Sequence, residues 1–221
     1  MGGPGGGRGH HRRCPARQSR RAAGRVGHRG RRHRLILAAY LAWGEDGLAR
    51  LDGDFAFAIW DGRRQQLFCA RDRFGLRAFY YAAGPRAFIF ASEIKGVLAA
   101  GVPDAPNDAF LAGYLLGLFD APQATAYRQI LRLPAAHALT VSAAGVSLRP
   151  YWQLRAPAEL RLDSDAAYAD AFRAEFTAAV RRRMRAAYPV GTLLSGGLDS
   201  SSVTCVARTL LPADQALHAY S

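Results

Sequence analysis

Short apolar runs separated by turn residues dominate the chain from residue 35 onward. The run 35–43 has the length and composition of a helix that ends at Gly44. Four more runs follow at close spacing, the first two joined by the turn signal Asp61-Gly62; they cover residues 55–60, 67–72, 79–82 and 88–91. Because connections this short join antiparallel neighbours, the pattern predicts an antiparallel sheet.

Helix and hairpin signals follow these strands. Ser92 is predicted to cap a helix, and Asn107 to cap a second helix that runs through Leu118. Further along, the segments 139–142 and 146–148 alternate on either side of a glycine turn and predict a hairpin.

A second domain is expected to begin with a long amphipathic helix. This helix is predicted from Asp163-Ser164 to about Tyr188, and the basic run 181–183 is interpreted as its solvated face. An apolar strand at 190–194, a helical pattern at 203–211 and a second strand at 216–220 follow.

The connection between that strand and the next helix, residues 195–201, has the sequence SGGLDSS. Two glycines let backbone N–H groups approach an anion, and the helix N-terminus adds the positive end of its dipole. Serine hydroxyls add donors, and Asp199 is a candidate ligand for a magnesium ion that bridges phosphates. The loop has neither the lysine of the Walker pattern nor the spacing of a dinucleotide fingerprint.

The charge of the chain is concentrated at its beginning. The net charge is +13, but residues 1–34 contain eleven Arg and no acid, so the remainder has 19 basic and 17 acidic residues, a net charge of +2. We predict that 1–34 is disordered, and we favour an out-of-frame stretch of a GC-rich gene over an RNA-binding tail. No membrane partner is expected, and nucleic acid is not an expected partner either.

The cysteines and the apolar runs indicate a cytoplasmic protein. Cys14, Cys69 and Cys205 are far apart and form no C-x-x-C pair, so neither a disulfide framework nor a zinc site is predicted. No apolar run is long enough to span a bilayer, and the basic N-terminus lacks the apolar centre of a secretory signal.

Several motifs, in this order, resemble one family. They are DGDFAFAIWD at 52–61, ARDRFGL at 70–76, FASEIK at 90–95 and the SGGLDSS loop. Together they resemble glutamine-hydrolysing asparagine synthetases over about residues 35–221. The resemblance implies an N-terminal-nucleophile glutaminase domain, a four-layer αββα sandwich, followed by a Rossmann-like ATP pyrophosphatase domain. The domains expected are 1–34 (disordered), 35–157 (glutaminase-like) and 160–221 (the start of the ATP-binding domain).

The resemblance also implies a reaction. A carboxylate, aspartate in the family, is adenylylated with Mg-ATP, and ammonia from glutamine displaces AMP to form an amide. ATP, Mg²⁺, glutamine and the carboxylate are then the small-molecule partners, and the full-length family implies a homodimer. The loop residues implied to bind ATP and pyrophosphate, with magnesium at Asp199, are Leu194, Ser195, Gly196, Gly197, Leu198, Asp199, Ser200 and Ser201.

The chain departs from the family where the glutaminase chemistry is concerned. The family carries a nucleophilic cysteine directly after the initiator Met, whereas this chain has Gly2, so we assign no catalytic residue to the glutaminase site. Arg32 and Arg34 replace an acidic pair of the family. Asp72 and Glu93 lie in matching motifs, but we interpret both as buried structural hydrogen-bond acceptors.

Three readings of the whole chain therefore stay open. The first is an asparagine synthase-like amidotransferase, whose piece present here is incomplete and inactive alone. The second is a relative such as a lasso-peptide cyclase or a β-lactam synthetase, a possibility raised by Arg77-Ala78-Phe79 in place of the family's Lys-Pro-Leu. The third is a non-catalytic fragment.

Overall fold

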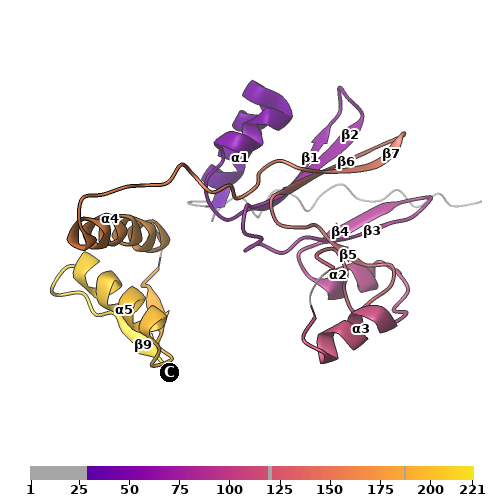
Figure 1. Ribbon diagram of the computed structural model, residues 1–221. Coiled ribbons are helices and arrows are strands. Elements are labelled where there is room, and N and C mark those ends of the chain that lie inside the picture. Colours follow the sequence, from indigo (N-terminus) through magenta and orange to yellow (C-terminus); the bar gives the residue numbers. More distant parts are fainter. Residues whose placement is uncertain (1–28, 119–120, 187) are drawn as a thin grey trace, which may run out of the picture. The chain divides into compact units, whose positions relative to one another are not determined.

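The computed structural model of the chain describes residues 29–118, 121–186 and 188–221 (Figure 1). The chain divides into two compact units, Met1–Arg155 and Ala156–Ser221. Helix α1 (Arg29–Trp43) begins before the apolar run, so residues 29–34, which we placed in a disordered segment, are helical. Arginine has a high helix propensity, and the apolar turns that follow give this stretch a helix to extend. The remainder of that segment, residues 1–28, lies outside the described residues.

Two antiparallel sheets form the centre of the first unit. The larger sheet has the order β1-β2-β6-β7, from β1 (Ala56–Asp61), β2 (Gln66–Arg71), β6 (His137–Ser142) and β7 (Gly145–Pro150). The smaller sheet has the order β4-β3-β5, from β3 (Tyr80–Ala83), β4 (Phe88–Ala91) and β5 (Leu131–Arg132). The predicted strands and their antiparallel pairings with sequence neighbours are confirmed, but the first four strands, expected in one sheet, divide between these two sheets.

Three apolar clusters show how the layers are stacked. Tyr40 of α1, with Leu48 of the 3-10 helix η1 (Gly44–Arg50), packs on one face of the larger sheet around Phe68. A second cluster joins the two sheets through Cys69 and Leu139 on one side and buried aromatic residues of the smaller sheet on the other. A third packs Val97 of helix α2 (Ile94–Ala99) on the outer face of the smaller sheet. The order helix–sheet–sheet–helix confirms the predicted αββα layers.

Helices α2 and α3 each differ from the sequence predictions at one end. The N-cap of α2 is Glu93 and not Ser92, and its side chain makes no capping hydrogen bond. Asn107 does cap helix α3 (Asp108–Leu115), because its Oδ1 accepts a hydrogen bond from the Phe110 N–H at 3.2 Å. Helix α3 ends at Leu115 and not at Leu118, since the chain turns at Gly117 with a positive φ of 71°.

The second unit contains two helices and a pair of parallel strands. Helix α4 (Asp165–Arg183) begins at the predicted cap, with Ser164 Oγ accepting from the Ala167 N–H, but it ends five residues before Tyr188. Strands β8 (Gly191–Leu193) and β9 (His218–Tyr220) pair in parallel, with helix α5 (Leu198–Leu210) between them in the chain. This arrangement confirms the predicted order of strand, helix and second strand. Helix α5 nevertheless begins at Leu198 and not at residue 203, so the second half of the predicted loop forms the first turn of the helix.

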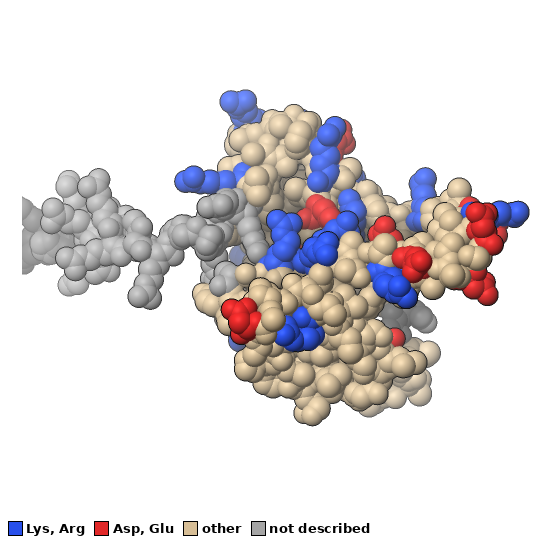
Figure 2. All heavy atoms as spheres, turned by 90° about the vertical axis from the view of Figure 1, so that its left-hand side faces the viewer, with Lys and Arg blue, Asp and Glu red and all other residues tan. Residues whose placement is uncertain are grey.

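The surface agrees with the nearly neutral composition of the folded part. The arginines of the run 181–183 are exposed, as predicted for a solvated helix face. On the face shown in Figure 2, basic and acidic side chains are interspersed between broad uncharged areas. Among residues 29–118, 121–186 and 188–221, no helix combines the length and the apolar character that a membrane span requires.

Candidate functional site

The loop after β8 has the backbone of a turn built around glycine. Gly196 has a φ of +82°, and a Cβ placed on it would meet nothing within 4 Å, so only the backbone conformation favours glycine there. Gly197 is the N-cap of α5 and supplies the carbonyl that accepts the first helical hydrogen bond, from the Ser201 N–H at 3.1 Å. No side chain caps this helix, so its first amides lack a partner of that kind.

Ser200 holds the loop in shape from within. Its hydroxyl accepts a hydrogen bond from the Ser195 N–H at 3.2 Å, donates to the Gly197 carbonyl at 3.2 Å, and lies 3.0 Å from Ser195 Oγ. The turn is therefore closed by side-chain contacts between residues five apart. Ser200 thus has a structural role that the sequence did not reveal, beyond the predicted one of a hydroxyl donor.

The loop lies at the carboxyl end of β8 and is open to solvent. Leu194 extends the strand by donating its N–H to the Tyr220 carbonyl at 2.7 Å, and the next four residues are exposed. Asp199 stands in the first turn of α5 and is exposed as well. In open α/β sheets, anionic ligands bind at this strand end, where a helix begins.

The donor set fits a nucleotide phosphate with its metal more closely than a free metal ion. Among the described residues, no group of three or more His, Cys, Asp or Glu is placed to hold a metal ion. The loop instead offers glycine amides, hydroxyls and the single carboxylate of Asp199, which suits a magnesium ion shared with phosphate oxygens. The exposed, positive-φ Gly196 leaves the space beside the amides free of a side chain.

The ARDRFGL motif of the first unit is a structural lock. The Asp72 carboxylate is 1% exposed and accepts three backbone hydrogen bonds, from the N–H groups of Phe74 (3.1 Å), Leu76 (3.0 Å) and Arg77 (2.9 Å). This confirms the interpretation of Asp72 as a buried structural acceptor.

The Arg71 side chain stabilises the same turn through further hydrogen bonds. Its guanidinium donates to the carbonyls of Gly75, Arg77 and Leu133, the last lying 62 residues along the chain at 2.7 Å. Gly75 adopts a φ of +66°, and a Cβ there would come within 3.0 Å of that guanidinium. The motif therefore joins the β2 end to the β5 segment, which the sequence alone did not indicate.

Glu93 does not behave as predicted. Its side chain is 64% exposed and pairs with Lys95, two residues along the chain. Because Glu93 precedes a short surface helix, its carboxylate reaches solvent and not the core. The interpretation of Glu93 as a buried acceptor is wrong.

The described cysteines differ sharply in access. Cys69 is fully buried between the sheets, and burial raises the pKa of its thiol to about 12. Such a thiol is neither ionised near neutral pH nor within reach of a substrate, so Cys69 is unsuited to nucleophilic chemistry. Cys205 lies exposed on α5, and Cys14 lies outside the described residues.

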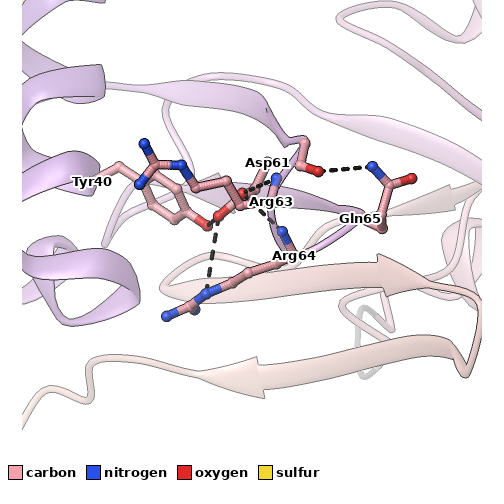
Figure 3. A network of polar contacts seen from close by, with 6 residues as sticks. Tyr40, Asp61, Arg63, Arg64 and Gln65 are labelled. Carbon is pink, nitrogen blue, oxygen red and sulfur yellow. Dashed lines mark hydrogen bonds and ion pairs between the residues drawn. The ribbon is translucent and has the colours of Figure 1, made fainter.

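A polar network ties α1 to the β1–β2 hairpin (Figure 3). The Tyr40 hydroxyl donates to Asp61 Oδ2 at 2.9 Å, while the backbone N–H groups of Arg63 and Arg64 donate to Asp61 Oδ1. The Arg64 N–H and the Tyr40 hydroxyl hold the pKa of Asp61 below its ordinary value, and burial raises that of Tyr40. The network positions the hairpin; it offers no open reactive group.

Known proteins place these two units in one family. A glutamine amidotransferase domain model matches residues 33–152, and an asparagine synthase model matches residues 171–221. The chain is 37% identical to asparagine synthetase [glutamine-hydrolyzing] 3 of Bacillus subtilis over 86% of its own length and 31% of the relative's. It is 31% identical to amidase chry2 of Gibberella zeae over 80% of this chain and 26% of that protein.

The chain spans between about a quarter and a third of the length of these curated relatives. Among solved structures it is similar to a glutamine phosphoribosylpyrophosphate amidotransferase from B. subtilis, at 14% identity and a TM-score of 0.32, over 80% of this chain and 34% of that one. The sequence matches cover the sheet motifs of the first unit and the loop of the second. The chain therefore belongs to the family of glutamine-hydrolysing asparagine synthetases.

Proposed function

We propose that this chain is part of an ATP-dependent amidotransferase that adenylylates a carboxylate and forms an amide with ammonia from glutamine. The observation that carries the proposal is the SGGLDSS loop at the carboxyl end of β8, with Gly196 at φ +82° and an uncapped helix start behind it. The asparagine synthase model covers this loop, and one of the two named relatives is an asparagine synthetase, which makes aspartate the first acceptor to test.

Each loop residue has a role in the proposed site. The backbone amides from Gly197 onward and the hydroxyls of Ser195 and Ser201 bind the pyrophosphate of ATP, while Ser200 keeps the turn closed. Leu194 aligns the nucleotide through its backbone, next to its bond with Tyr220. Asp199 holds magnesium, which when bound neutralises charge on the phosphates.

The first test is nucleotide binding to the whole chain. We expect Mg-ATP to bind, and Asp199→Asn to weaken binding by about tenfold or more, because a metal-bound carboxylate is replaced by a neutral amide. Asp214→Asn is the matched control, since Asp214 is also exposed but follows the far end of α5. Equal affinities of the two variants, or no binding of Mg-ATP to the parent chain, would refute the site.

The glycine pair offers a second test of the same loop. Gly196→Ala forces an L-residue to a φ of +82°, which costs about 1–2 kcal/mol, whereas Gly197 has an ordinary φ of −79°. We expect Gly196→Ala to lower Mg-ATP affinity more than Gly197→Ala does. The opposite order would mean that close approach at Gly197 matters more than the shape of the turn.

The acceptor is identified by pyrophosphate release. If adenylylation occurs in the enzyme of which this chain is part, release of pyrophosphate from Mg-ATP depends on the added carboxylate, and we expect aspartate to support it and glutamate not to. Failure of both amino acids to support release, in an enzyme that binds Mg-ATP, would contradict aspartate as the acceptor and favour another carboxylate.

A further inference from the structure

A hollow is lined by residues of α3, of the segment that follows it and of β5. Its volume is about 420 Å³, within the range of about 300–1,000 Å³ typical of small-molecule sites. Its described lining includes Asn107, Phe110, Tyr114, Leu118, Pro122 and Arg132. We call it the α3 hollow; its described lining residues belong to the first unit, whereas the nucleotide loop belongs to the second.

Arg132 is the cation of the α3 hollow, and it lacks a counter-ion among the described residues. Arg132 pairs with Tyr80 across β5 and β3, and its guanidinium carbon lies 6.0 Å from the centre of the Tyr80 ring. The Arg132 Nε is buried and makes no hydrogen bond, and none of the ion pairs between described residues involves Arg132. The Arg132 guanidinium therefore has neither a hydrogen-bond partner nor an ion-pair partner among the described residues, which leaves its charge available to an anion.

A second guanidinium makes an anion more favourable here. The pKa of the Arg71 guanidinium is lowered, and burial is the larger cause. The second cause is the positive charge of Arg132, which lies near enough to act on Arg71. The Arg71 donors are committed to the carbonyls of Gly75, Arg77 and Leu133. An anion on Arg132 would therefore relieve the repulsion between two like charges without competing for Arg71.

The other residues that line the α3 hollow favour a ligand with an apolar part. The Phe110 and Tyr114 rings stack with centroids 6.4 Å apart, and Leu118 and Pro122 complete the lining. Asn107 uses its oxygen to cap α3, and its amide nitrogen makes no hydrogen bond with a described residue. The hollow thus combines apolar and aromatic walls with one cation and one amide donor, a pattern typical of sites for small organic molecules.

We propose that the α3 hollow binds a small monocarboxylate with an apolar or aromatic body. The carboxylate pairs with the Arg132 guanidinium, whose planar fork matches two carboxylate oxygens. The apolar body lies against Phe110 and Tyr114. This proposal does not depend on the proposed nucleotide loop, so the two can be tested separately.

Benzoate is the probe, titrated into the full chain and followed by isothermal calorimetry or ligand-observed NMR. We expect saturable binding at millimolar concentration, with benzamide and inorganic phosphate each binding at least about tenfold more weakly, since the first lacks the charge and the second the apolar body. Arg132→Gln is expected to weaken benzoate by about tenfold or more. Arg86→Gln, which changes the charge equally at an exposed turn, is expected to leave it unchanged.

A second variant protects the test against misfolding of the first. Ala109→Phe keeps Arg132 but fills the hollow from the exposed side of α3, so it should also abolish benzoate binding. Loss in both variants, with native binding in Arg86→Gln and unchanged circular dichroism in Ala109→Phe, supports the site. Absence of benzoate binding to the parent chain, equal binding of benzamide, or full binding to Ala109→Phe overturns it, and phosphate binding as tightly as benzoate would show a plain anion site instead.

Discussion

Replacing Asp72 with Asn tests whether the ARDRFGL motif acts as a structural lock. The two oxygens of Asp72 accept three backbone hydrogen bonds, two at Oδ1 and one at Oδ2. An asparagine keeps the size but has one oxygen and one NH₂ group. In the better of its two orientations the NH₂ faces the N–H of Arg77, so two donors oppose each other.

The magnitude follows from that count. One hydrogen bond to a charged group is lost, and one partly buried N–H is left without an acceptor, which together cost about 2–4 kcal/mol. This is a large fraction of the roughly 5–15 kcal/mol that stabilise a typical domain. Glu93→Gln is the matched control, because its pair with Lys95 is exposed and screened by solvent and therefore contributes little to stability.

Tryptophan fluorescence during urea unfolding is the assay. The three tryptophans of the chain, Trp43, Trp60 and Trp152, all lie in the first unit, so the signal reports that unit alone. We expect Asp72→Asn to lower the unfolding midpoint clearly and Glu93→Gln to leave it nearly unchanged. If the two variants differ by less than about 0.5 kcal/mol, the lock contributes no more than an ordinary surface residue, and the reasoning fails.

The remaining predictions concern pH, access and capping. Burial, and after it the charge of Asp72, raises the pKa of Tyr151 from 10.0 to about 12. The contribution of Tyr151 to stability is therefore present below about pH 10 and is lost as the pH rises toward 12. Urea midpoints should fall over that pH window, and they should fall less steeply in Tyr151→Phe. In a Cys14→Ser background, a thiol reagent should label Cys205 quickly and Cys69 only when urea unfolds the protein; fast native labelling of both would contradict the burial of Cys69. Asn107→Ala should cost about 0.5–2 kcal/mol in the same unfolding assay, and an unchanged midpoint would show that the cap is dispensable.

The local chemistry of the chain determined much of the fold. Alternation and turn residues predicted the strands of both hairpins, because a strand buries one face against a layer and its neighbour must return through a short turn. The same holds for the loop at 195–201, where the order of strand, glycines and helix is local and could be recognised without coordinates. The Asn107 cap was also predicted, since it depends on residues three apart.

Contacts between distant residues were decided only by the tertiary structure. Glu93 and Asp72 both lie in motifs that match the family, yet one is exposed and the other buried, because burial depends on which layer covers the segment. The Arg71 bond to Leu133 spans 62 residues, and Arg132 meets Tyr80 only through the pairing of β5 with β3. Sequence periodicity describes neighbours along one element, whereas hydrogen bonds and hollows of this kind arise where separate elements are packed together.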